Sequence, residues 1–170
     1  MPNYCDFTMK IVGDIHDIIP IYNACVAEYH NKPTDPKHFY RVFECSIQEV
    51  SSTHMICTGY CAWSVATCFL NGGYHDGTMP NGVCLEMMTE HVAVEIYSTE
   101  MGMCFSEHII VKNNQVTLEE STDYYELDKD YSLEEFNKIT GLDWDQQQFD
   151  NYFKREDYYI YCEHDFDFTI

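Results

Sequence analysis

Basic residues are scarce in this sequence: 9 Lys and Arg stand against 29 Asp and Glu, which leaves a formal net charge of −20. With so few cations, the chain lacks the basic patch with interleaved aromatic residues that nucleic-acid binding uses. It also lacks a phosphate-binding loop, because Gly72-Gly73 is too short and no Lys and Ser or Thr follow it. We therefore expect no direct binding of nucleic acid, and we expect repulsion from anionic lipid.

Long apolar runs are missing as well. No stretch approaches the roughly 20 residues that a membrane-spanning helix needs, and no N-terminal stretch resembles a signal peptide. The nine cysteines are odd in number and form no C-x-x-C pair, which favours free thiols in a reducing cytoplasm over a disulfide framework. Cys5, Cys45 and Cys104 fall at apolar positions of expected elements, where a thiol acts as a small hydrophobic group. We expect a cytoplasmic protein without membrane association.

The chain has enough apolar material to fold. Its 170 residues are 45% hydrophobic, and 14 Tyr, 10 Phe and 2 Trp give a large aromatic content. Such a composition supports one sizeable core and argues against disorder despite the charge. We therefore predict one folded structural unit.

Periodicity and turn residues predict a mixture of strands and helices. A helix capped by Asp14 or Asp17 should run to about residue 30, and the Asp17 start is preferred because it places Pro20 in the first turn. The apolar residues expected along this helix are Ile18, Ile19, Tyr22, Val26 and Tyr29. The expected strands are residues 5–13, 39–47, 55–60, 92–98, 104–112, 115–121 and 158–161, and the other expected helices are one ending at residue 70, one at about 83–91, one opened by a Ser132–Glu135 capping box and stopped by Gly141, and one capped by Asp145.

Several segments resemble a known family. Met1–Cys5 with the strand that ends at Gly13, Gly59–Val65, Glu95–Gly102 and Phe105–His108 are similar to segments of YubB-type ferredoxin-like proteins, which phages, plasmids and conjugative elements encode. The resemblance spans roughly residues 1–126. It departs from the family pattern at Met101, where an acid and a Pro often precede the Gly.

The resemblance implies an α+β fold and a mobile-element origin. Residues 1–126 should form a ferredoxin-like antiparallel sheet with helices on one face. Residues 127–170 should form an acidic, aromatic-rich α/β extension packed on it as part of one structural unit. The family implies no established catalytic residues, so function has to be inferred from the residues themselves.

Two sets of residues suggest chemistry. His54, Cys57, Cys61, Cys68, His75 and Cys84 are dense, but they lack the tight spacing of structural zinc sites, so we expect buried thiols, no metal and no cofactor. Cys104 and His108 are four residues apart on an expected strand, which puts their backbones about 13 Å apart, too far for a thiol–imidazole pair.

Glu107 is the stronger anomaly, because strand alternation places it on the core face with Phe105 and Ile109. Pairing through the Asn113-Asn114 turn would bring Glu120 opposite it, as a candidate functional carboxylate pair. The alternative is a single buried Glu that accepts hydrogen bonds from a Tyr, a Trp or the backbone.

Acidic residues concentrate at the end of the chain. From Glu119 onward there are 16 acidic and 4 basic residues, or −12, against 13 and 5, or −8, in the first 118 residues. Such a surface is either a solvated, solubilising face or a fixed array that imitates the phosphate charge of a duplex. The candidate partner-binding residues are Asp123, Glu126, Asp128, Asp130, Glu134, Glu135, Asp143, Asp145, Asp150, Glu156 and Asp157, with Tyr125 and Trp144 as aromatic anchors.

These observations predict a non-catalytic protein of a mobile element in a bacterial host cell. It would bind and inhibit a basic, nucleic-acid-handling host defence protein of the CRISPR-effector or restriction-enzyme kind, in part by mimicking nucleic-acid charge. Two alternatives stay open: a metal-assisted hydrolase that uses Glu107, Glu120 and His108, and a regulatory adaptor of the element itself.

Overall fold

The computed structural model describes residues 3–27, 36–72, 81–100, 105–123, 132–141, 143–153 and 168–170. The protein is of the α+β class, as predicted. It divides into two compact units, the first made of Met1–Thr122 and Phe168–Ile170, the second of Asp123–Asp167. In the part of the chain that the structure describes, no helix is long and apolar enough to cross a bilayer.

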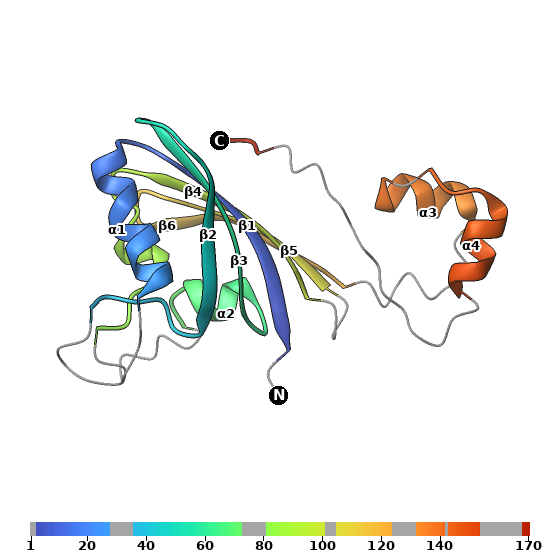
Figure 1. Ribbon diagram of the computed structural model, residues 1–170, viewed down its shortest axis with the longest axis horizontal. Helices are drawn as coiled ribbons and strands as arrows, with labels where there is room; N and C mark the ends of the chain where they lie inside the picture. Colours follow the sequence, from blue (N-terminus) through green and yellow to red (C-terminus); the bar gives the residue numbers. More distant parts are fainter. Residues whose placement is uncertain are drawn as a thin grey trace. The chain divides into compact units, whose positions relative to one another are not determined.

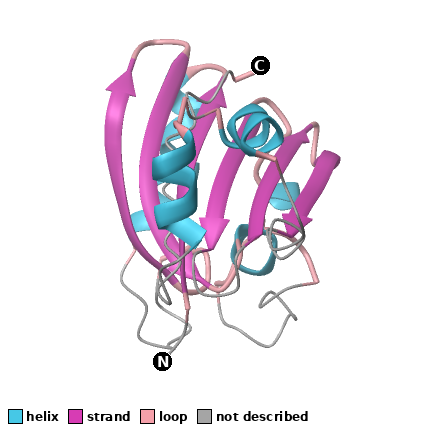
Figure 2. Cartoon of the chain, turned by 90° about the vertical axis from the view of Figure 1, so that its right-hand side faces the viewer, coloured by secondary structure: helices cyan, strands magenta, loops and turns pink. Residues whose placement is uncertain are grey.

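The first unit is built on a six-stranded antiparallel sheet of order β2-β3-β1-β4-β5-β6 (Figure 1). Figure 2 shows the strands side by side. The strands are β1 (Tyr4–Val12), β2 (Val42–Val50), β3 (His54–Ala62), β4 (Ala93–Glu100), β5 (Phe105–Lys112) and β6 (Gln115–Asp123), and the helices of this unit are α1 (Ile15–Val26), α2 (Val65–Phe69) and the 3-10 turn η1 (Leu85–Met87). All the predicted strands that fall on described residues are present.

The core lies between one face of this sheet and the helices α1 and α2. Alternation along β1 turns Phe7, Met9 and Ile11 into the core, where each is at most 3% exposed. Central β1 pairs with β3 on one side and β4 on the other. The ring of Phe69 on α2 packs edge-on against Phe7, with 5.3 Å between the ring centroids. Ile18 on α1 is fully buried in the same core cluster.

Two local features fix the register of the sheet. Asn113 and Asn114 join β5 to β6 with φ angles of 52° and 58°, the left-handed pair that a two-residue type I′ hairpin turn requires. This confirms the predicted turn. At Gly59, a Cβ atom would lie 2.1 Å from the Glu44 carbonyl oxygen, so only glycine allows β2 to approach β3 there.

The first helix starts earlier than predicted. Asp14 is the N-cap and accepts a 2.8 Å hydrogen bond from the His16 N–H, so the preferred Asp17 start is wrong. The start is set by the neighbouring loop, since Ile15 N–H donates to the Ser52 carbonyl. Pro20 consequently lies inside the helix, beyond its first turn. The helix also ends at Val26, and the predicted apolar face is partly wrong because Ile19 and Val26 are exposed while Ile21, Ala24 and Cys25 are buried.

Two further predictions need correction. The strand expected at residues 39–47 begins only at Val42, because Arg41 has a φ of 59°, which no strand residue adopts. The helix expected at residues 83–91 is reduced to η1, because the Thr89 N–H donates to the Asn114 side chain and cannot continue a helix. At residues 83–91 a tertiary contact therefore overrides the local pattern.

The described part of the second unit is a pair of short helices, α3 (Leu133–Thr140) and α4 (Gln146–Phe153). The predicted capping box is confirmed, and Gly141 ends α3 with a left-handed φ of 70°. Asp145 caps α4 by accepting a 2.8 Å hydrogen bond from the Gln148 N–H, also as predicted. Phe136 is fully buried, and the rings of Trp144 and Phe149 lie 5.1 and 5.3 Å from it. The strand predicted at residues 158–161 lies outside the described residues.

Candidate functional site on the open face of the sheet

The face of the sheet opposite α1 and α2 carries polar side chains in register. Lys10 on β1 is opposite Glu95 on β4, and in the next row Tyr97 is opposite His108 on β5. These residues alternate with the core residues Met9, Ile96 and Ile109, so they point away from the core. The three central strands thus bring a cation, a carboxylate, a phenol and an imidazole together.

Glu95 is fully buried although it lies on this outer face. The His108 Nε2 atom is 2.8 Å from its Oε1 atom, and the Tyr97 hydroxyl donates to the same oxygen at 3.3 Å. The remaining donors come from the far end of the chain: the N–H groups of Thr169 and Ile170 donate to Oε2 at 2.7 and 3.0 Å. The Thr169 hydroxyl donates to Oε1 at 3.1 Å.

These hydrogen bonds set the charge state of the carboxylate. Burial raises the pKa of Glu95, but the hydrogen bonds from His108, Ile170 and Thr169 outweigh it and hold the pKa below its usual value. Glu95 is therefore ionised near neutral pH. Its buried negative charge is stabilised by the groups that donate hydrogen bonds to it.

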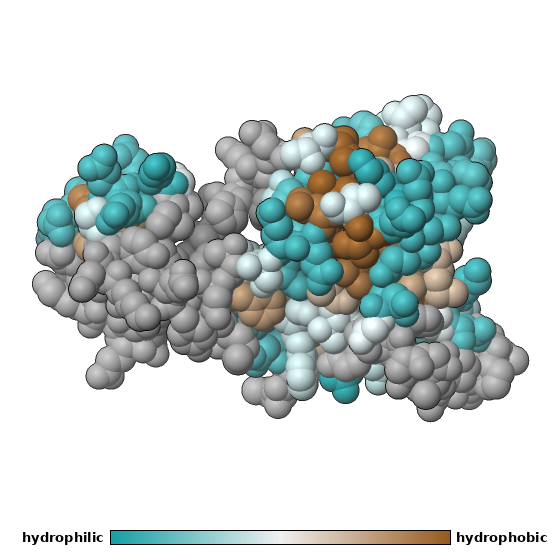
Figure 3. All heavy atoms as spheres, turned by 180° about the vertical axis from the view of Figure 1, so that it is seen from behind, coloured by the Kyte–Doolittle hydropathy of each residue, from teal (hydrophilic) through white to brown (hydrophobic). Residues whose placement is uncertain are grey.

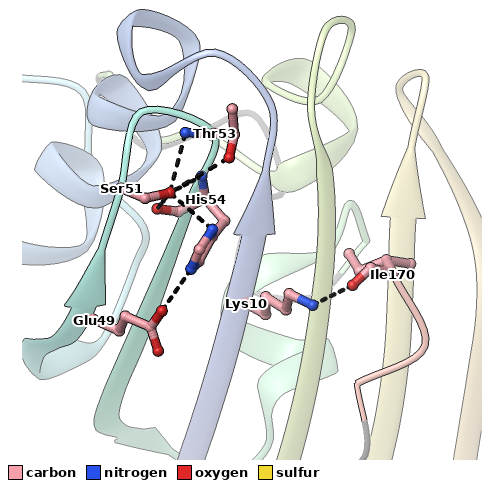
Figure 4. A network of polar contacts seen from close by, with 6 residues as sticks. All are labelled: Lys10, Glu49, Ser51, Thr53, His54 and Ile170. Atoms are coloured by element: carbon pink, nitrogen blue, oxygen red, sulfur yellow. Dashed lines mark hydrogen bonds and ion pairs between the residues drawn. The ribbon is translucent and has the colours of Figure 1, made fainter.

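Segment Phe168–Ile170 is held on this face by aromatic and cationic contacts as well. The Tyr97 ring stacks on the His108 ring with a centroid distance of 4.1 Å and an interplanar angle of 13°. Phe168 packs edge-on against Tyr97 at 5.8 Å, and the Lys10 ammonium lies 5.6 Å from the Phe168 ring centroid. Lys10 also donates a hydrogen bond to the main-chain oxygen of Ile170 (Figure 4).

We call the side chains of Lys10, Glu95, Tyr97 and His108 the open-face site. Enzymes often use a carboxylate that orients a His as a general base. Here both carboxylate oxygens also hold the backbone or side chain of residues 169–170, and this arrangement suits recognition of a peptide segment. Sequence reasoning missed Glu95 and Lys10. Their partners Thr169 and Ile170 lie 74 or more positions further along the chain, and no local pattern indicates these contacts.

On the core face, Glu107 is buried and fastens α2 to the sheet. Its Oε2 atom accepts the Val65 N–H at 2.7 Å and the Ser98 hydroxyl at 2.7 Å, and its Oε1 atom accepts the Ala66 N–H at 3.2 Å. Together with the Ser64 hydroxyl, which accepts the Thr67 N–H at 3.0 Å, it satisfies the otherwise unpaired donors of the first turn of α2. A negative charge also suits this end of a helix.

This geometry bears on the candidate carboxylate pair. Glu107 is 7% exposed and its oxygens accept backbone and hydroxyl donors, as in the alternative interpretation of a buried Glu held by the backbone. Glu120 on β6 is exposed. His108, the third residue of the hydrolase alternative, points to the opposite face of β5, where it contacts Glu95. The sheet therefore separates Glu107 from His108.

The described cysteines lie in the core as free thiols. Neighbouring thiols and burial raise the pKa of Cys45, Cys57 and Cys61 far above the usual value, so they are protonated and poor nucleophiles. Burial and the nearby Glu86 raise the pKa of Cys84 to about 11. Among the described residues, no group of three or more His, Cys, Asp or Glu is arranged to hold a metal ion. Of the Cys/His set considered in the sequence analysis, His75 lies outside the described residues.

His54, from the same set, belongs to a polar network at the β2–β3 turn (Figure 4). Ser51 Oγ lies 2.8 Å from His54 Nδ1, and Glu49 Oε1 lies 2.8 Å from His54 Nε2. The combination of Ser, His and Glu resembles the residue set of a hydrolase. However, Ser51 Oγ also accepts the N–H groups of Thr53 and His54, at 3.2 and 3.1 Å, so this network closes the hairpin turn.

The predicted partner-binding residues fall into three groups. Glu134, Glu135, Asp143 and Asp145 are exposed on the α3–α4 unit, while Trp144 is half-buried against Phe136. Asp123 ends β6 and Asp150 lies in α4, and the structure describes neither side chain. The others, Glu126, Asp128, Asp130, Glu156, Asp157 and Tyr125, lie outside the described residues.

Comparisons of this chain with known protein families, with curated proteins and with solved structures found no significant match.

Proposed function

We propose that this chain is a non-catalytic inhibitor that binds a basic, nucleic-acid-handling host defence protein, of the anti-CRISPR or anti-restriction type. One observation carries the proposal: in the part of the α3–α4 unit that the structure describes, aromatic rings pack against one another while four carboxylates are exposed. Phe136 is fully buried, whereas Glu134, Glu135, Asp143 and Asp145 are exposed. In Figure 3 the visible described atoms of this unit are mostly hydrophilic, whereas a hydrophobic patch lies on the first unit.

The mechanism we propose is competition for cationic sites. Carboxylates held on a folded frame pair with Lys and Arg side chains that otherwise bind phosphate. The net charge of −20 adds long-range attraction to a basic partner and speeds association at low salt. Two of the exposed carboxylates are also fixed in direction, because Glu135 accepts from the Ser132 N–H at 3.0 Å and Asp145 from the Gln148 N–H at 2.8 Å.

We further propose that residues 1–126 have the ferredoxin-like arrangement of the YubB-type proteins. The support is the strand order β2-β3-β1-β4, with β1 antiparallel to both of its neighbours and with α1 and α2 packed in the core on one face. Strands β5 and β6 extend this sheet as a hairpin. A mobile-element origin is proposed from the same resemblance, and a cytoplasmic place of action from the odd number of cysteines without a C-x-x-C pair.

The test is inhibition of DNA cleavage by a panel of purified restriction enzymes and CRISPR effectors, across a salt series. We expect inhibition of at least one enzyme, weakening as salt increases. The variant Glu134→Gln/Glu135→Gln/Asp143→Asn/Asp145→Asn removes four charges yet keeps both cap acceptors, and it should weaken inhibition.

The matched control removes four exposed charges from the first unit: Asp17→Asn/Glu90→Gln/Glu119→Gln/Glu120→Gln. If both variants lose the same amount of inhibition, only the total charge matters and the α3–α4 unit is not the binding surface. If no enzyme of the panel is inhibited, the proposal in this form fails, and the regulatory adaptor becomes the better hypothesis.

A further inference from the structure

Burial of Glu95 is the starting observation. Its side chain lies on the open face of the sheet and is nevertheless 0% exposed. A carboxylate in that position faces water unless another segment covers it, and the segment that donates to it here is Phe168–Ile170. An ionised carboxylate is buried at low cost only when donors surround it, so site and segment are chemically matched.

The open-face site forms hydrogen bonds with three main-chain atoms of the segment. Two successive N–H groups, those of Thr169 and Ile170, converge on one oxygen of Glu95, as the N–H groups of a backbone nest converge on an anion. Lys10 donates to the main-chain oxygen of Ile170. These contacts demand a non-proline residue at the positions of Thr169 and Ile170, and they accept many side chains.

Selectivity for particular side chains comes from the contacts of Phe168 and Thr169. The Phe168 ring lies near the Lys10 ammonium and packs against Tyr97 in a T-shaped arrangement, which favours an aromatic residue at this position. The Thr169 hydroxyl donates to Glu95 Oε1 at 3.1 Å, which favours Thr or Ser. The Tyr97–His108 stack gives the site a rigid wall.

We propose that the open-face site is a peptide-recognition site for the pattern aromatic–Thr or Ser–any residue except proline, which the chain fills with its own Phe168–Ile170 and which accepts the same pattern from a separate peptide once that segment is displaced. The carboxylate of Glu95 is the principal recognition group, and Lys10 and Tyr97 select the preceding aromatic residue. This site is independent of the acidic surface proposed above.

The test uses the full chain with Thr169→Pro, which removes both donors of residue 169 and vacates the site. The probe is a fluorescent synthetic hexapeptide with the sequence of residues 165–170, and binding is followed by fluorescence anisotropy. We expect Thr169→Pro to bind the probe at least about tenfold more tightly than the wild-type chain, because the tethered segment competes at a high effective concentration in the wild type. Thr169→Ser, which keeps both donors, should behave like the wild type.

Two controls show whether binding uses the proposed groups. Adding Glu95→Gln to Thr169→Pro should abolish binding, and the same hexapeptide with Pro in place of its Thr should not bind either variant. If the probe binds Thr169→Pro no better than wild type, or if Glu95→Gln leaves binding intact, the proposal is wrong. Circular dichroism checks that each variant is folded.

A second measurement needs no variant. In the wild-type chain, hydrogen exchange at the amides of residues 169 and 170 should be slowed at least about tenfold relative to the free hexapeptide, because both amides are bonded to a buried carboxylate. Exchange as fast as in the free peptide would overturn the proposal whatever the behaviour of the variants.

Discussion

Truncation of Glu107 is the sharpest test of how the core face is assembled. The change Glu107→Ala removes the acceptor of the Val65 and Ala66 N–H groups and of the Ser98 hydroxyl, at bonds of 2.7, 3.2 and 2.7 Å. Each lost hydrogen bond to a charged group is worth about 1.5–3 kcal/mol, and the contributions are not fully additive. We therefore expect a loss of about 3–5 kcal/mol in the free energy of unfolding.

The assay is urea denaturation followed by circular dichroism, and two variants calibrate it. Glu107→Gln keeps one acceptor oxygen and should lose less, about 1–3 kcal/mol. Glu120→Ala changes an exposed carboxylate on β6 and should stay within about 0.5 kcal/mol of the wild type.

A loss below about 1 kcal/mol for Glu107→Ala would refute the reasoning. Removal of an acceptor that binds three buried donors should lower the free energy of unfolding by more than the substitution of a surface residue does. A different result would revive the candidate carboxylate pair. If Glu107→Gln left stability unchanged but abolished a measured activity or a bound metal, Glu107 would be functional.

Three further predictions concern other parts of the first unit. The hydrogen bonds to Glu95 hold its folded-state pKa below the unfolded value. Its contribution to stability is therefore present above the unfolded pKa of about 4.3 and is lost as pH falls through the folded pKa. Proteolysis of the Phe168–Ile170 segment, measured by mass spectrometry, should accelerate in that acidic range. Asn113→Ala should destabilise the protein by about 1 kcal/mol in urea denaturation, because Ala tolerates a φ of 52° poorly, while Asn113→Gly should be nearly neutral. Cys61, buried among thiols that raise its pKa, should react with a thiol reagent only after denaturation, and labelling in the native state would contradict its placement.

The strands were predictable because their signals are local. Alternation in β1 and in the β4–β6 hairpins is dictated by which side chains face the core, and Asn113-Asn114 demands a tight turn by its own backbone preference. The caps at Ser132 and Asp145 were found for the same reason, since a cap and its partner are three residues apart.

The errors occur where distant segments decide local structure. Helix α1 begins at Ile15 because the loop at Ser52 accepts its N–H, and residues 83–91 fail to form a helix because Asn114 takes the Thr89 N–H. The core position of Glu107 followed from strand alternation, but its partners on α2 did not. Of the open-face site, only His108 was named as a candidate from the sequence. Lys10, Glu95 and Tyr97 were missed, since the segment that donates to Glu95, Thr169 and Ile170, lies 74 and 75 positions away.

Two of the three buried glutamates among the described residues, Glu95 and Glu107, favour binding over catalysis at their positions in the first unit. Glu95 and Glu107 point to opposite faces of the sheet, and both use their oxygens to hold backbone N–H groups from a distant segment, residues 169–170 in one case and residues 65–66 in the other. A general base needs an oxygen or nitrogen that can reach a substrate proton. To act as a general base, either carboxylate would first have to release the segment that it binds, and several hydrogen bonds to a charged group would be lost. The physical role that fits both residues is attachment: Glu107 fixes α2 to the core, and Glu95 fixes a peptide segment to the open face.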